Sequence, residues 1–338
     1  MTTESIKDSF KMLQMTEKET TQILLEEDIL VPDIKPDLSN IVSIEGKVKI
    51  IDKDIANGKV KCTGKMDLKI LYVPVENRGD YPLVPMDAVV DFRNELDYLI
   101  SDKSEVEVLV NVEHMDYSIV NERKLKIKAV ANITAKSYQT LNMDLVSKTE
   151  NEEMQFLKNQ IKYTDILERK KAAIDIKEEL SIKDGMPEIG QILNWDINIF
   201  ENQKQIINDR AVINATVQYN ILYLSDEVEP TPVLFRDTSE FTQFIDIKNV
   251  ESNVDSKVDF SLNYSNITLK QDVEENATLL EADIDIQTDI EISQLKEKEI
   301  LIDAYHPQKE VEVETDLIKC KLLCGKGAAE IPVREIIT

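Results

Sequence analysis

The sequence repeats itself at an offset of 151 residues (Pro36 to Pro187, 187 − 36 = 151). The tripeptide Ile70-Leu71-Tyr72 returns unchanged at residues 221–223. The positions that mark the repeat most clearly are Pro36, Ile41, Tyr72, Pro187, Ile192 and Tyr223. Because a period this long corresponds to a whole domain rather than to a short solenoid unit, the sequence predicts a duplicated domain.

The length of the chain agrees with this duplication. Its 338 residues, 42% of them hydrophobic, suffice for two cores of about 150 residues each. We therefore expect a first copy over residues 1–150, a second copy over 151–307 and a tail over 308–338.

The chain is strongly acidic, with 65 Asp and Glu against 40 Lys and Arg and a formal net charge of −25. This charge argues against a nucleic-acid partner, because affinity for a polyanion comes from neutralising its phosphates. Solubility and a basic partner both remain as explanations of the acidity. No segment approaches the roughly 20 apolar residues of a membrane-spanning helix, and residues 1–8 lack the pattern of a signal peptide. We expect synthesis in the cytoplasm.

Most of the chain alternates in the manner of β-strands. In residues 59–73 apolar side chains alternate with lysines and one aspartate, which predicts a half-buried antiparallel sheet. Residues 6–13 and 154–161 instead carry apolar side chains at helical spacing. The predicted fold is mainly β, with two tandem homologous antiparallel β-sandwich-like domains. Each domain would have a short helix, and a C-terminal tail would contribute a helix and a strand.

No arrangement typical of catalysis stands out. The two histidines, His114 and His306, lie far apart, and the sequence has no glycine-rich phosphate loop and no nucleophile elbow. The many carboxylates are spread over predicted solvent faces, so they do not identify a general acid and base. We predict no catalytic residues, no cofactor and a protein that is not an enzyme.

The three cysteines are too few for a disulfide framework. Cys62 lies on an apolar strand face and is predicted to be a core residue. Cys320 and Cys324, four residues apart, would share one face of a helix, but too few further ligands lie nearby for a zinc site. Plain packing, a redox or intermolecular cross-link, and metal binding are the open interpretations of this pair; we assign no metal.

One run of residues resembles a known family. Residues 29–42, ILVPDIKPDLSNIV, followed by Ile70-Leu71-Tyr72-Val73, resemble the SPOCS domain of clostridial and bacillar spore-coat assembly proteins. Residues 180–193 and 221–223 resemble a diverged copy, and the similarity extends over residues 17 to about 307. The resemblance implies a non-enzymatic role in building the spore envelope, with synthesis in the mother cell and a final place at the spore surface. Some relatives carry a LysM module that contacts the coat; none is recognised in this sequence, so that contact is not carried over.

The tail resembles the beginning of a third copy. Residues 317–324 would form a helix that ends at Gly325, and residues 328–337 resemble the strand that opens the second copy at residues 172–180. A lone strand with no sheet of its own needs a sheet edge. It would fold back on the second copy, be the cut end of a longer protein, or pair with a neighbouring molecule by strand addition. The side chains expected to make this contact are Ile331, Val333, Ile336 and Ile337.

Taken as a whole, the sequence predicts a structural or scaffolding protein of the spore surface, in coat, exosporium or appendage. It would assemble with copies of itself through sheet edges and the C-terminal strand, and with other spore-envelope proteins. The competing hypothesis is an adaptor or glycan-binding module recruited to the spore envelope, because acidic β-domains with variable loops can hold ligands.

Overall fold

The computed structural model describes residues 5–56, 58–75, 82–97, 105–149, 153–207, 209–248, 254–270, 278–315, 317 and 319–323. These residues contain twelve β-strands and no helix. The strands are β1 (Ser5–Leu30), β2 (Leu38–Ala56), β3 (Lys59–Pro74), β4 (Val84–Asp97), β5 (Glu105–Asn121), β6 (Lys124–Thr149), β7 (Gln155–Ser181), β8 (Ile189–Ile207), β9 (Arg210–Ser225), β10 (Pro232–Asp246), β11 (Asp255–Lys270) and β12 (Leu279–Tyr305).

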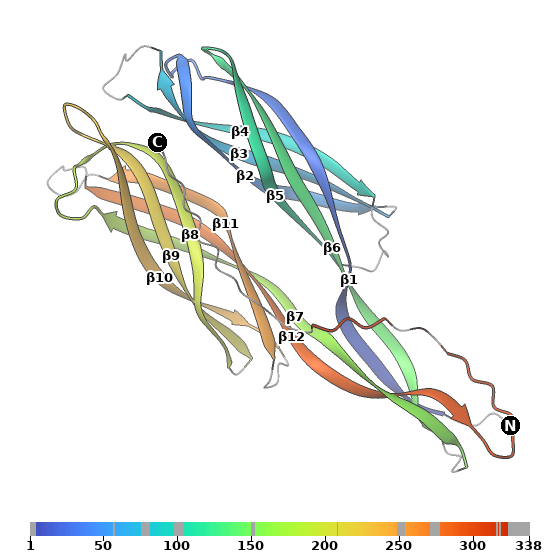
Figure 1. The fold of residues 1–338 in the computed structure, drawn as a ribbon. Coiled ribbons are helices and arrows are strands. Elements are labelled where there is room, and N and C mark those ends of the chain that lie inside the picture. Colours follow the sequence, from blue (N-terminus) through green and yellow to red (C-terminus); the bar gives the residue numbers. More distant parts are fainter. Residues whose placement is uncertain are drawn as a thin grey trace, which may run out of the picture.

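The strands form four three-stranded antiparallel sheets, two in each copy (Figure 1). In the first copy, sheet β1-β6-β5 packs on sheet β2-β3-β4; in the second, sheet β7-β12-β11 packs on sheet β8-β9-β10. The predicted mainly β, antiparallel, sandwich-like fold is therefore confirmed. The strand predicted over residues 59–73 is β3, the central strand of its sheet, which buries one face as expected.

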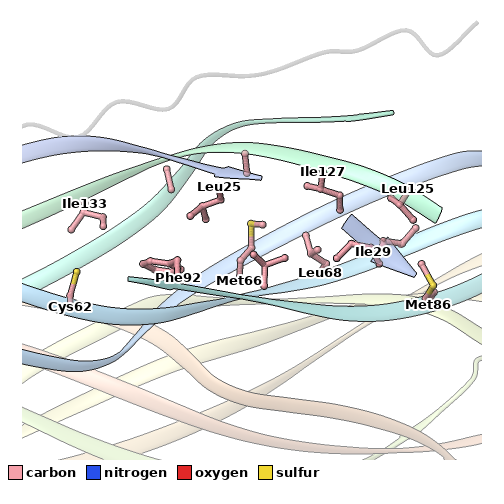
Figure 2. Close-up of a cluster of buried hydrophobic side chains, with 14 of the residues drawn as sticks. Leu25, Ile29, Cys62, Met66, Leu68, Met86, Phe92, Leu125, Ile127 and Ile133 are labelled. Carbon is pink, nitrogen blue, oxygen red and sulfur yellow. The ribbon is translucent and has the colours of Figure 1, made fainter. Parts of the chain in front are cut away.

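The core of the first copy lies between its two sheets. Leu25, Ile127 and Ile133 on one sheet point toward Met66 and Phe92 on the other (Figure 2). Cys62 is 1% exposed within this cluster, which confirms it as a core residue. The second copy has an equivalent cluster built largely from β9 and β12.

The two copies also share the irregularities of their strands. Four β-bulges of the first copy, at residues 16, 39, 42 and 51, recur at residues 167, 190, 193 and 202 of the second, each 151 residues later. Bulges are features that related domains keep, since each one re-aims all the side chains that follow it. Their recurrence shows that the duplication preserved the backbone in detail.

The residues that mark the repeat hold the same turn in both copies. The hydroxyl of Tyr72 donates a hydrogen bond of 2.8 Å to the carbonyl oxygen of Pro36, and the hydroxyl of Tyr223 donates one of 2.9 Å to that of Pro187. Both tyrosines are fully buried, whereas Ile41 is buried and Ile192 half-buried against the core. The recurring Pro and Tyr therefore form a latch, by which we mean this hydrogen bond from strand to turn. In the first copy it joins β3 to the β1–β2 turn, and in the second it joins β9 to the β7–β8 turn.

Removing either tyrosine hydroxyl should destabilise the protein to a similar extent. In Tyr72→Phe and in Tyr223→Phe the carbonyl of a half-buried proline loses its partner, which costs about 1 kcal/mol. Chemical denaturation of each variant measures this loss. An effect confined to one of the two variants would contradict an equivalent latch in both copies.

The prediction of short helices over residues 6–13 and 154–161 is wrong. Residues 6–13 belong to β1, and residues 155–161 belong to β7. In residues 6–15 of β1 the buried side chains are Phe10, Met12 and Gln14, which alternate with period two. The backbone of residues 5–15 is paired with residues 138–149 of β6, a partner more than 120 residues away that overrides the local helical spacing.

The helix predicted in the tail is not formed either. Residue 317 and residues 319–323 form neither helix nor strand. The backbone groups of Lys319, Lys321 and Leu323 bond to residues of β1 and β7.

Candidate functional site at the junction of the two copies

Each copy extends one pair of strands beyond its sandwich as a two-stranded arm. Residues 5–15 of β1 pair with 138–149 of β6, and residues 155–166 of β7 pair with 293–305 of β12. Among the described residues, β5 and β11 pair with β6 and β12 only as far as Tyr138 and Ser293. Because an isolated two-stranded ribbon is marginally stable in water, the arms need a further partner.

The arms pack on each other through corresponding faces (Figure 1). Phe10 and Met12 of the first arm correspond at the repeat offset to Ile161 and Tyr163 of the second, and all four lie in one cluster. The rings of Phe10 and Tyr163 meet edge to face, with centroids 5.2 Å apart. The carboxylate of Asp165 accepts a 3.0 Å hydrogen bond from the backbone N–H of Leu13 and lies 2.6 Å from Nζ of Lys296. The arms therefore bury an apolar face that neither could bury alone.

Where the arms meet the sandwiches, Arg169 on β7 of the second copy contacts side chains of the first copy. Its guanidinium lies 2.9 Å from a carboxylate oxygen of Glu105 and 3.0 Å from one of Glu107, and also contacts Glu291 at 3.4 Å. It stacks 3.5 Å from the ring centroid of Tyr138, whose hydroxyl donates to Glu107. The side chains of Arg169 and Glu107 are each only 15% exposed, so these charge-assisted contacts are shielded from water. Arg169 thus links β7 to β5 and β6 of the first copy.

A third contact joins β8 to the outer face of sheet β2-β3-β4. The ammonium of Lys69 lies 3.3 Å from the ring centroid of Trp195 and donates a 3.1 Å hydrogen bond to its carbonyl oxygen. Nearby, Lys47 pairs with Asp196 at 2.8 Å. Burial alone would raise the pKa of Asp196, but the hydrogen bonds from Lys47 and Asn198 outweigh it and hold that pKa below its usual value. Leu71 of the first copy packs with Leu193 and Leu224 of the second beside this contact.

The contact at Lys69 should respond to alkaline pH. Burial lowers the pKa of Lys69 from 10.5 to about 8, although neighbouring carboxylates oppose this shift. Between pH 8 and pH 10.5, roughly, Lys69 is mostly protonated in the unfolded chain and mostly neutral in the folded chain. The free energy of unfolding therefore increases as the pH rises through this range. Denaturation of the wild type and of Lys69→Met at pH 7.5 and pH 10 measures the effect. The stability of the wild type relative to the variant should increase with pH; a constant difference would contradict the assignment.

The described end of the tail lies along the seam between the arms. The side-chain amide of Gln14 donates to the carbonyl oxygen of Lys319 (2.9 Å) and accepts from the N–H of Lys321 (3.2 Å). The carbonyl oxygen of Lys321 in turn accepts a 3.0 Å hydrogen bond from the N–H of Thr164 on β7. The described end of the tail therefore contacts both copies. Residues 328–337, for which contact with the second copy was one of three alternatives, lie outside the described residues.

Cys320 is half-buried in this seam, beside Phe10, Met12 and Tyr163. Burial raises the pKa of its thiol, which lowers the fraction of reactive thiolate at neutral pH. Cys324, the other half of the predicted cross-linking pair, lies outside the described residues, so the cross-link stays a prediction. The side chains predicted for donor-strand contact, Ile331, Val333, Ile336 and Ile337, also lie outside the described residues.

Little in the sequence points to the residues that join the copies. Arg169, Asp165, Lys69 and Lys47 are ordinary charged side chains in a chain that is 31% charged. Trp195 packs partly on the core of the second copy and partly beneath Lys69. Over the part of the chain that the structure describes, no group of three or more His, Cys, Asp or Glu side chains could hold a metal ion. The same part has no helix long and apolar enough to cross a membrane.

Comparison with known proteins finds the repeated unit in a family. A family model described as SipL, SPOCS domain matches residues 37–120 and residues 188–270, which span β2–β5 and β8–β11. No curated protein and no solved structure matches the chain. The match indicates a sporulation-related role at the spore coat or envelope, and it leaves the arms and the tail outside both matched segments. The chain belongs to the SPOCS-domain family, whose domain it carries in two tandem copies.

Proposed function

We propose that this protein is a non-enzymatic structural protein of the endospore envelope, whose two joined SPOCS domains form one rigid building block. The observation that supports the proposal is the junction: two arms, an ion cluster at Arg169 and the tail all serve to fix one copy against the other. A structural block needs a fixed shape more than it needs a cleft. Fixed relative placement of two domains is therefore the property that this architecture supports best.

The block also offers strand edges for assembly. In the described part of the chain, residues 139–149 of β6 and 294–305 of β12 pair on one side only, which leaves their other backbone edges open. Open edges accept strands from other molecules. The tail already lies beside β7 in extended form, and residues 328–337 would supply the strand to an edge on the next molecule.

Electron microscopy and light scattering of the purified protein over a range of concentrations test this proposal. The full chain should form assemblies, and a chain ending at Gly325 should not. In the full-length chain, Ser substitutions at Ile331, Val333, Ile336 and Ile337 should have the same effect as truncation. Glu330→Ala with Arg334→Ala is the control in the same segment and should assemble normally.

Two results would count against the proposal. Assemblies of unchanged form after truncation would rule out the donor-strand contact. A full chain that stays monodisperse at all concentrations, and is captured instead by a single coat protein, would favour an adaptor over a building block.

A further inference from the structure

The central rows of the outer face of sheet β8-β9-β10 carry almost no charge, whereas the flanking rows hold Asp196 and Arg236 at one end and Arg210 and Asp246 at the other. The central rows comprise twelve outward-facing positions on the three strands, of which Glu240 alone is charged. These positions are Asn198, Phe200, Gln203, Gln205, Val212, Asn214, Thr216, Gln218, Thr238, Glu240, Thr242 and Phe244.

The corresponding face of the first copy is the opposite in character. Its twelve equivalent positions on β2, β3 and β4 contain ten charged residues. They are Lys47, Lys49, Asp52, Asp54, Lys61, Thr63, Lys65, Asp67, Val89, Asp91, Arg93 and Glu95. Since the backbone is the same, the loss of charge is a property of this one face and not of the fold.

Amides and hydroxyls replace the charges. Thr242 donates a 2.8 Å hydrogen bond to the side-chain oxygen of Asn214, and the amide of Asn202 donates one of 2.8 Å to the hydroxyl of Thr216. Among the described residues, the amides of Gln203, Gln205 and Gln218 form no side-chain hydrogen bond, so their donors and acceptors face solvent. The face is therefore an array of neutral hydrogen-bonding groups with unused capacity.

A hollow and two exposed aromatic rings lie on the same face. The hollow, of about 480 Å³, is lined mainly by Asn202, Gln203, Asn214, Glu240 and Thr242. Phe200 is 53% exposed and Phe244 is 61% exposed, which is unusual for rings of this size. From strand spacing and rise, the Cα atoms of the two phenylalanines are about 16 Å apart across the sheet.

We propose that this face binds a neutral oligosaccharide. Sugar hydroxyls both donate and accept hydrogen bonds, as side-chain amides do, and the C–H faces of sugar rings pack on exposed aromatic rings. Two rings this far apart fit separate residues of one oligosaccharide, with the hollow between them. A charged ligand finds no ion pair here beyond Glu240, and a second protein molecule finds only Phe200, Phe244 and Val212 for an apolar contact.

The position of the face leaves it accessible. The contacts with the first copy lie at the other end of the sheet, at Leu193, Trp195 and Asp196 of β8 and at Leu224 of β9. The neutral rows begin beyond that end and run toward the β8–β9 turn. The first neutral row touches the junction through Asn198, which donates a 2.8 Å hydrogen bond to Asp196. The hollow and the two phenylalanines lie in the rows beyond it, so the sugar site does not depend on the tail or on the proposed assembly.

Isothermal titration of the full chain with chitohexaose, cellohexaose and, as an acidic comparison, hexagalacturonate tests the proposal. At least one neutral hexasaccharide should bind, and hexagalacturonate should not. Phe200→Ala with Phe244→Ala should weaken that binding at least tenfold. Binding of chitohexaose alone would identify an N-acetylated amino sugar, whereas binding of cellohexaose alone would identify an unsubstituted glucan.

An exchange of residues between the two copies gives the matched control. Thr216→Lys with Gln218→Asp places on the second copy the side chains that the first copy carries as Lys65 and Asp67, so folding should be preserved while binding falls at least tenfold. The reverse exchange, Lys65→Thr with Asp67→Gln, should leave binding unchanged.

Three outcomes would overturn the proposal: no neutral hexasaccharide binds, the exchanged face binds as the wild type does, or hexagalacturonate binds equally well. Loss of self-association in the phenylalanine variant, with sugar binding unaffected, would instead assign the face to contact between copies of the chain.

Discussion

Arg169→Met should lower the free energy of unfolding by about 3 kcal/mol, because the shielded carboxylate of Glu107 loses its closest cation and keeps only Lys136, 3.7 Å away. Glu105 contributes less to this loss, since its side chain is 66% exposed and its charge is screened by water. Trp195, the sole tryptophan, lies at the junction, so its fluorescence reports the transition directly during urea unfolding.

Two further variants separate the junction from a general loss of charge. Lys18 occupies the position in the first copy that corresponds to Arg169 and is exposed, so Lys18→Met should change the unfolding free energy by no more than about 0.5 kcal/mol. Arg169→Met combined with Glu107→Gln should be more stable than Arg169→Met alone, because the shielded carboxylate that has lost its closest cation is gone. Equal effects of Lys18→Met and Arg169→Met would contradict the role of Arg169 in joining the copies.

Gly64→Ala should destabilise the first copy by about 3 kcal/mol. A Cβ at this position would lie 2.3 Å from Cζ of Phe92 and 2.6 Å from the carbonyl oxygen of Lys49, and neither the packed ring nor the backbone can yield cheaply. The second copy has Ala215 at the equivalent position, where Phe241 across the strand pair has turned to meet Phe260 edge to face.

Gly46→Ala is the matched control for this substitution. Its Cβ would meet the sulfur atoms of Met115 and Met66 at 3.2 Å, and these flexible side chains can move aside. Thermal unfolding of both variants should show a large loss for Gly64→Ala and a small change for Gly46→Ala. Similar midpoints would mean that Phe92 adapts more freely than its packing indicates.

The duplication and the sandwich could be predicted because both depend on local alternation and on a repeat that the sequence displays directly. The latch from Tyr72 to Pro36 could not be predicted, although both residues were marked by the repeat. Its hydrogen bond depends on how the turn before β2 folds over β3. The repeat showed which residues matter, and the structure shows the reason.

The arms illustrate where sequence patterns fail. Three apolar side chains within eight residues fit a helix as well as a strand, and the choice was decided by β6, which is distant in sequence. A helix would place Phe10, Met12 and Gln14 on different faces, whereas the strand places them on one face. The surface that contacts the second arm could therefore not be predicted from the helical pattern. The neutral face of sheet β8-β9-β10 was also missed, because its character emerges only when three strands are placed side by side.

Immunogold labelling of sporulating cells that produce this protein tests the proposed role in the spore envelope most directly. Label should lie over the envelope layers of the mature spore and should be lost when the chain ends at Gly325. Label that stays in the mother-cell cytoplasm throughout sporulation, and never reaches the spore envelope, would contradict this role.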